Sequence, residues 1–225
     1  MTSKIKNSFK LLLYFLLVII SAESLAQDSK LKLIRDDDGI KIFKEKNAHN
    51  NINRIVVSSE VSANYMSIVC LIKDFRSHKD WMFANHGAYI IDSISPYEWI
   101  YYSISETPWP LVDRDVVSRV KLNIYPESKQ VIIKSIGEPD LIPASQEMIR
   151  IPKLISQWTI TKIDADHSMV ELDILADAGG KVPQWIVNLF ASSGPFRTIE
   201  NMKLELQKDK YNKPDCGYKL LIQKF

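Results

Sequence analysis

The chain has 225 residues, and its 29 basic and 27 acidic side chains leave a formal net charge of +2 at pH 7. Three lysines (Lys4, Lys6 and Lys10) and one acid (Glu23) lie in the first 26 residues, so residues 27–225 carry equal numbers of positive and negative side chains. A neutral domain lacks the basic field that phosphate binding needs, which excludes nucleic acid as a partner and argues against a polybasic contact with anionic lipid.

The first 26 residues have the features of a signal peptide. Lysines precede an unbroken apolar run at 11–20, and Ser24 and Ala26 place small residues at the −3 and −1 positions of a cleavage site before Gln27. The alternative is a retained membrane anchor, but this run is shorter than the roughly 18 to 20 residues that span a bilayer. We therefore expect a cleaved signal peptide at 1–26 and a periplasmic or secreted protein, with 27–225 forming one domain.

The two cysteines leave two alternatives open. In an oxidising compartment Cys70 and Cys216 could form a disulfide. However, Cys70 lies in an apolar helical run, where a buried free thiol is equally plausible. The spacing does not decide between them.

The elements before residue 88 begin with an antiparallel strand pair, near 40–45 and 55–61, after a turn that contains three aspartates. These aspartates lack calcium-loop spacing, because Asn47 stands where the closing bidentate Glu is required. Ser62 is then expected to cap a helix. Its apolar face consists of Tyr65, Ile68, Val69, Ile72 and Phe75.

From residue 88 to 176 the pattern indicates strands almost throughout. Apolar and polar residues alternate, so that one face of each strand is apolar and the other charged, which is typical of an antiparallel sheet wetted on one side. With the first pair, about eight strands are expected, enough to curl around a helix. The longest irregular stretch, 137–146, is expected to lie over the mouth of a cavity. The six segments are 88–94, 98–105, 115–125, 130–136, 156–163 and 168–176.

The last apolar stretch predicts a long amphipathic helix over 182–208. Pro183 suits its first turn, and Gly194-Pro195 should kink or restart it because proline cannot donate a backbone hydrogen bond. The whole pattern therefore indicates an α+β fold, in which a curved antiparallel sheet receives the C-terminal helix. The expected buried face of this helix is Trp185, Leu189, Phe196, Ile199, Met202 and Leu206.

The sequence shows no pattern of a reaction centre. Its four histidines lack metal-ligand spacing, and it has no Cys-x-x-Cys, no Gly-x-Ser-x-Gly and no glycine-rich phosphate loop. His78 with Asp80 and His86 could form a base and its orienting partner, but a surface hydrogen bond is the commoner interpretation. We expect no catalytic residue, no metal and no cofactor. The five tryptophans fit either a filled core or an interior open to an apolar guest.

One segment resembles the START (steroidogenic acute regulatory protein-related lipid transfer) domain family. Thr107–Arg119 contains the Pro-rich turn, the Arg-Asp pair and the apolar strand that characterise the family. Three further stretches agree and follow in the same order, at 38–43, 148–150 and 180–188. The resemblance implies a helix-grip fold with a tunnel between sheet and closing helix for one lipid or similar molecule. It also implies that the 137–146 loop and the closing helix gate this tunnel.

The resemblance also implies roles for particular residues. Arg114 and Asp115 would be a structural pair, and the chain would bind its hydrophobic ligand as a monomer, with transfer between membranes through transient membrane contact. Sterol-binding members usually place an arginine where this chain has Val120, whereas Arg119 should face the opposite side. The alternatives are a helix-grip enzyme of the cyclase or hydrolase type, for which Ser118 is a weak candidate, and an interaction module with a filled core. The expected ligand-binding residues are Trp109, Ser118, Val120, Leu172, Trp185, Leu189 and Phe196.

Overall fold

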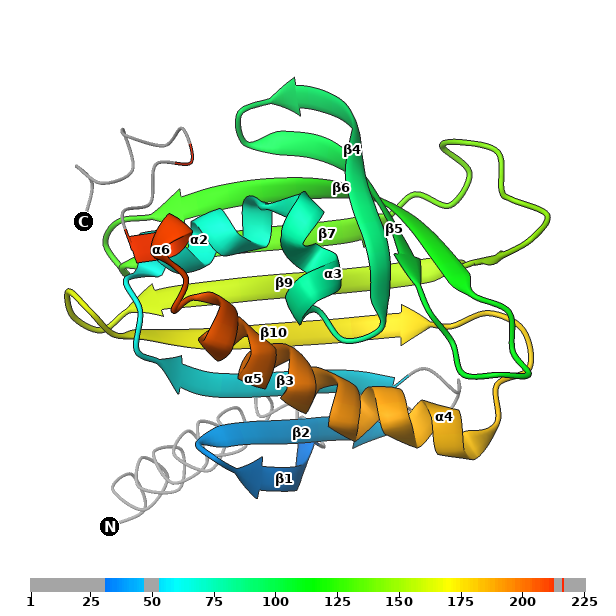
Figure 1. The fold of residues 1–225 in the computed structure, drawn as a ribbon, viewed down its shortest axis with the longest axis horizontal. Helices are drawn as coiled ribbons and strands as arrows, with labels where there is room; N and C mark the ends of the chain where they lie inside the picture. Colours follow the sequence, from blue (N-terminus) through cyan, green and yellow to red (C-terminus); the bar gives the residue numbers. More distant parts are fainter. Residues whose placement is uncertain (1–30, 47–52, 213–215, 217–225) are drawn as a thin grey trace, which may run out of the picture. The chain divides into compact units, whose positions relative to one another are not determined.

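The computed structural model describes residues 31–46, 53–212 and 216 (Figure 1). The expected signal peptide at 1–26 lies outside these residues. The described part of the chain forms a ten-stranded sheet in the order β1-β2-β3-β10-β9-β7-β6-β5-β4, with β8 paired to β6. Its strands are β1 (Leu31–Asp37), β2 (Ile40–Lys46), β3 (Asn53–Val61), β4 (Asn85–Ser95), β5 (Glu98–Ser105), β6 (Arg114–Tyr125), β7 (Gln130–Gly137), β8 (Ile149–Arg150), β9 (Lys153–Lys162) and β10 (Ser168–Asp177).

The sheet confirms the predicted strand pattern. All pairs are antiparallel except β6 with β8. The eight predicted strands are present, and β1 and β8 are additional. β1 escaped prediction because it is an edge strand on which no residue is fully buried, so it lacks the alternation that marks a half-buried strand. β8 is too short to show a period.

The helices lie on one side of the sheet (Figure 1). The first contains the predicted apolar face except Phe75, which lies in the 3₁₀ turn that follows. Asn64 caps this helix instead of Ser62, because the Asn64 side chain accepts a hydrogen bond from the Met66 N–H at 2.8 Å. The helices are α2 (Tyr65–Lys73), a short 3₁₀ turn (Phe75–Ser77), α3 (His78–Trp81), α4 (Gln184–Asn188), a π-helical segment (Leu189–Ser193), α5 (Gly194–Glu205) and α6 (Asp209–Asn212).

The closing helix restarts at Gly194-Pro195, as predicted. The π-helical segment ends immediately before Gly194, and Pro195 occupies the first turn of α5. After Gly194, all four residues of the expected buried face are buried: Phe196, Ile199, Met202 and Leu206. Before Gly194, Trp185 is 54% exposed, and Ile186 is buried instead. The expectation for Trp185 is wrong because a π segment changes the helical phase, so one 3.6-residue period does not continue across it.

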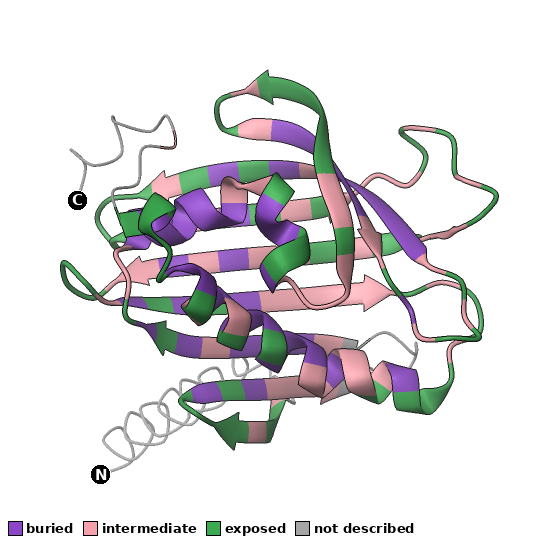
Figure 2. Cartoon of the chain, viewed as in Figure 1, coloured by how far each residue is buried: buried purple, intermediate pink, exposed green. Residues whose placement is uncertain are grey.

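The core occupies the concave face of the sheet and the helices above it, with the buried positions visible in α2, α5 and the sheet centre (Figure 2).

Cys70 in α2 forms a disulfide with Cys216, so the first of the two alternatives for the cysteines holds. Among the described residues, no helix combines the length and apolar character needed to cross a membrane.

The predicted pairing of Arg114 with Asp115 is wrong. Consecutive residues of a strand point to opposite faces, so these two side chains cannot meet. Asp115 instead accepts two hydrogen bonds of 3.0 Å from Arg150 and one of 3.1 Å from the Tyr102 hydroxyl. Arg114 donates to the backbone oxygens of Val112 and Ala178. The buried ion pair of this strand is therefore Asp115 with Arg150.

The 137–146 loop packs on the outer face of the sheet, away from the helices. Ile142 contacts an apolar cluster from β5 and β6, made of residues that alternate with those facing the helices. Arg150 donates further hydrogen bonds to the carbonyl oxygens of Pro139 and Ile142. The expectation that this loop covers a cavity is therefore wrong, because strand alternation defines two faces of the sheet but does not say which one a loop will cover.

Candidate functional site

A cavity of about 230 Å³ lies between the concave face of the sheet and the segment from α2 to Phe83. One buried water needs only roughly 10–15 Å³ on the same kind of measure, so the protein's own side chains do not fill this space. Its lining residues are Ile72, Phe75, His78, Met82, Phe83, Asn85, Trp99, Tyr101, Ser103, Ser105, Val116, Ser118, Val120, Ile133, Ser135, Ile151, Leu154, Ser156, Trp158, Leu172 and Ile174.

Most of the wall is apolar and comes from alternate positions of five strands. Val120 on β6 lies opposite Ser135 on β7, and Trp158 on β9 lies opposite Leu172 on β10. Because side chains alternate across a strand, this register places all four on the concave face. The indole of Trp99 adds an aromatic surface beside Val120. Such a wall can hold an apolar molecule that leaves water.

Serine side chains interrupt this wall on four neighbouring strands, β5, β6, β7 and β9. Ser118 on β6, Ser135 on β7 and Ser156 on β9 form what we call the serine floor. Ser135 and Ser156 are direct cross-strand partners. Ser118 pairs with Gly137, two residues after Ser135 on β7, so Ser118 and Ser135 are diagonal neighbours on the same face. Ser118 is only 1% exposed, and its hydroxyl has no hydrogen-bond partner. A buried hydroxyl without a partner is rare and needs an explanation.

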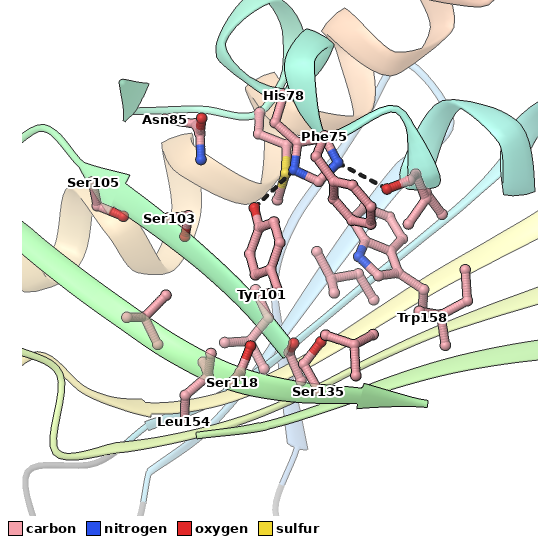
Figure 3. Close-up of a pocket in the computed structure, with 18 of the residues that line it drawn as sticks. Phe75, His78, Asn85, Tyr101, Ser103, Ser105, Ser118, Ser135, Leu154 and Trp158 are labelled. Carbon is pink, nitrogen blue, oxygen red and sulfur yellow. Dashed lines mark hydrogen bonds between the residues drawn. The ribbon is translucent and has the colours of Figure 1, made fainter. Parts of the chain in front are cut away.

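His78 and Tyr101 form the opposite, polar side of the cavity (Figure 3). His78 Nε2 lies 2.8 Å from the backbone oxygen of Ile72 and must donate to it, because a carbonyl oxygen only accepts. In the neutral ring Nδ1 is then the acceptor, and the Tyr101 hydroxyl donates to it at 2.8 Å. Burial lowers the pKa of His78 to about 4 and raises the pKa of Tyr101. Both side chains are therefore uncharged at neutral pH.

This buried histidine should make the protein less stable in mild acid. The pKa of about 4 in the folded state lies below the ordinary 6.5, so between these values the unfolded chain takes up a proton that the folded chain does not. Stability is complete above pH 6.5, and the free energy of unfolding should fall by about 2 kcal/mol between pH 7 and pH 5. Urea unfolding across this range measures the loss. The same decline in His78→Gln would contradict the assignment to His78.

No lining residue among those described is Asp, Glu, Lys or Arg. The expectation for β6 holds: Val120 faces the cavity, whereas Arg119 lies on the outer face and forms ion pairs with Glu98 and Glu138. The described residues also contain no cluster of His, Cys, Asp or Glu able to hold a metal ion. The cavity therefore offers hydroxyl, amide, imidazole and indole groups to a guest, but no formal charge at neutral pH.

The structure brings three of the seven predicted ligand-binding residues together. Ser118, Val120 and Leu172 line the cavity. The other four predicted residues do not line the cavity, and three of them belong to the closing helix. One of these, Phe196, packs against Arg35, whose guanidinium carbon lies 3.3 Å from the centroid of the Phe196 ring. Their predicted role in ligand binding stays a prediction. The fourth, Trp109, is 90% exposed in the loop between β5 and β6. The four are Trp109, Trp185, Leu189 and Phe196.

Sequence reasoning missed the polar residues that come from the helical side of the cavity. The sequence favours a surface position for His78, but the side chain is buried against Tyr101. Asn85 lies at the start of β4, and its buried side-chain oxygen has no hydrogen-bond partner. The only signal in the sequence is His78 itself, placed just after the apolar helix and the turn that follows it. Nothing local indicates that β5 brings Tyr101 to it.

Comparison with known proteins identifies a family and a fold for this chain. The family model of the START domain matches residues 37–210. An uncharacterized protein from Pseudomonas aeruginosa is 25% identical over 189 residues, which cover 84% of this chain and 92% of that protein.

Solved structures agree with this match. A STAR-related lipid transfer protein fragment from Xanthomonas axonopodis superposes with a TM-score of 0.72 at 23% identity, covering 79% of this chain and 99% of that one. Human StAR-related lipid transfer protein 5 superposes with a TM-score of 0.73 at 15% identity, covering 92% and 99%. At these identities the likeness establishes the fold, and the expected helix-grip fold is confirmed.

Proposed function

Because the chain belongs to the START domain family, whose model matches residues 37–210, we propose that it binds a lipid or another hydrophobic small molecule in the cavity beneath α2 and α3. The observation that carries this proposal is the unfilled space of about 230 Å³ behind an apolar wall. A filled interior would have favoured an interaction module instead.

The binding energy would come from burial of apolar surface. Transfer of apolar surface out of water is favourable by about 25 cal/mol per Å², so a ligand that hides a few hundred Å² gains several kcal/mol without any charged contact. Trp99, Trp158 and Leu172 supply the wall that takes this surface. The site needs only to be dry and shaped to its guest.

We further propose that this binding proceeds without bond-making. A catalytic histidine needs a free ring nitrogen near a reacting group, but both nitrogens of His78 are engaged, by Ile72 and Tyr101. Its lowered pKa also makes it a weak base at neutral pH. The rival is an enzyme of the cyclase or hydrolase type. Chemical change of a bound ligand recovered after incubation, followed by mass spectrometry, would support that rival.

Filling the cavity should weaken ligand binding. Val120→Phe places a larger side chain at a lining position, and we expect it to weaken the affinity for a fluorescent fatty-acyl probe by at least about tenfold, because a ring that occupies the site excludes apolar ligand surface. The matched control is Ile136→Phe on β7, whose side chain is exposed and lies opposite the outward-facing Arg119. Equal probe affinity in Val120→Phe and the wild type would refute the assignment of the site.

Transfer of the ligand between membranes is a further proposal. Trp109 and Val112 are exposed in the β5–β6 loop and offer apolar surface for a transient membrane contact by a monomer. The test is movement of a labelled lipid from donor to acceptor vesicles. A rate no higher with the purified protein than without it would exclude transfer.

We propose that the protein works outside the cytoplasm, in the periplasm or as a secreted protein. The signal-like sequence at 1–26 supports this location, and so does the disulfide between Cys70 and Cys216, since disulfides persist in oxidising compartments. N-terminal sequencing of the protein from cell fractions is the test. An intact N-terminus in the cytoplasmic fraction would contradict the proposal.

A further inference from the structure

The cavity has a polar part that an ordinary hydrocarbon would leave unsatisfied. The hydroxyl of Ser118 and the side-chain oxygen of Asn85 are buried without a hydrogen-bond partner. Leaving such groups unpaired away from water costs about 1–3 kcal/mol each. Both residues line the cavity, and Figure 3 places Ser118 on the sheet side and Asn85 near the helical side. The indole N–H of Trp99, a third lining residue, is also buried without a partner. Three unpaired polar atoms on the lining residues of one cavity indicate a guest with a polar group.

The chemistry of these atoms restricts what that group can be. The oxygen of Asn85 only accepts a hydrogen bond, so its partner must donate. The Ser118 hydroxyl can donate or accept, as can the other two hydroxyls of the serine floor. An alcohol both donates and accepts, whereas a ketone or an ester offers only acceptors. A hydroxyl group is therefore the simplest partner for either end of the cavity.

Electrostatics disfavours a charged group at the serine floor. None of the described lining residues is an acid, a lysine or an arginine, and burial keeps His78 uncharged by lowering its pKa. Of the two arginines on the lining strand β6, Arg119 points outward and is engaged by Glu98 and Glu138. Arg114 lies on the cavity side of the strand but outside the lining; it donates to backbone oxygens, and one of its nitrogens has no hydrogen-bond partner. Lys73 also lies outside the lining, with its ammonium 5.4 Å from the centroid of the Trp99 ring. A carboxylate or ammonium group at the serine floor would lose its hydration and find no charged partner among the lining residues, which is unfavourable.

We propose that the ligand is an uncharged amphiphile whose hydroxyl group hydrogen-bonds to Ser118 on the serine floor, while its hydrocarbon part lies against Val120, Trp158 and Leu172. This inference rests on the proposed function, since it specifies the ligand of the same cavity. Ser118 is thus a specificity-determining residue. It selects the polar group, while the apolar wall supplies most of the affinity.

The test compares four ligands with one ten-carbon chain: decane, decanol, decanoate and decylammonium. Trp99 and Trp158 line the cavity, so quenching of tryptophan fluorescence reports binding. We expect decanol to bind at least about tenfold more tightly than either charged ligand. Ser118→Ala should weaken decanol by about two- to tenfold, the effect of one lost hydrogen bond, and leave decane within about twofold. Ser128→Ala, in an exposed turn, is the matched control.

The outcomes distinguish the inference about the hydroxyl group from the proposed binding function. Tightest binding of decanoate or decylammonium would overturn the inference and leave the cavity as a binding site. An equal loss of decane and decanol affinity in Ser118→Ala would show that the serine acts through shape, and would also overturn it. If none of the four compounds quenches the fluorescence, the proposed binding function itself fails.

Discussion

Replacing Asp115 by alanine should lower the free energy of unfolding by about 3–5 kcal/mol, the cost of breaking a buried ion pair by removing one partner. The Asp115 side chain is 1% exposed and that of Arg150 is 8% exposed. Without the carboxylate, Arg150 stays buried with an uncompensated charge and the Tyr102 hydroxyl loses its acceptor. The guanidinium also holds the 137–146 loop through Pro139 and Ile142, so the loop should loosen as well. Urea denaturation measures the change.

A second carboxylate–arginine pair on the same sheet provides the control. Asp173 accepts hydrogen bonds from Arg54, but both side chains are partly exposed, so Asp173→Ala should cost about 1 kcal/mol or less. Similar losses in the two variants would show that the burial of Asp115 and Arg150 contributes nothing, which would contradict this account of the outer face.

Removing the disulfide should have an effect of similar size. Cys70 and Cys216 are 146 positions apart in the sequence, and closing a loop of this length restricts the unfolded chain. We expect Cys216→Ala to lower the free energy of unfolding by about 2–5 kcal/mol, with most of the effect in the unfolded state. Denaturation with urea under non-reducing conditions measures it.

The reductant dithiothreitol supplies the control for this prediction. It should destabilise the wild-type protein by about as much as the substitution does, and it should leave Cys216→Ala unchanged. A wild-type protein that is insensitive to the reductant would mean that Cys70 and Cys216 are not bonded in solution.

Most of the sheet could be predicted from the sequence because its central strands are half-buried. On β6, Val116, Ser118 and Val120 alternate with outward-facing residues, and all three line the cavity. The alternation of side chains along the strand therefore also predicts which sheet residues face the site. The same alternation places Arg114 and Asp115 on opposite faces of the sheet, so their side chains cannot be in contact. The family resemblance suggested the pair, whereas strand geometry excludes it.

The rest of the site depends on contacts between distant segments. His78 meets Tyr101, 23 residues later, only because β5 runs beneath the short helices. The position of Trp185 depends on the π-helical segment that follows it, which a 3.6-residue period does not reveal. No local pattern specifies such features, so the helical side of the cavity appears only in the folded structure.

Native mass spectrometry of the purified protein tests the central claim, a cavity that holds a hydrophobic guest, most directly. We predict that the wild-type protein retains a co-purified small molecule, released on denaturation as an uncharged, hydroxyl-bearing lipid, and that Val120→Phe carries none. A wild-type protein that shows only the mass of its own chain, and that takes up no lipid when offered a mixture, would contradict the account.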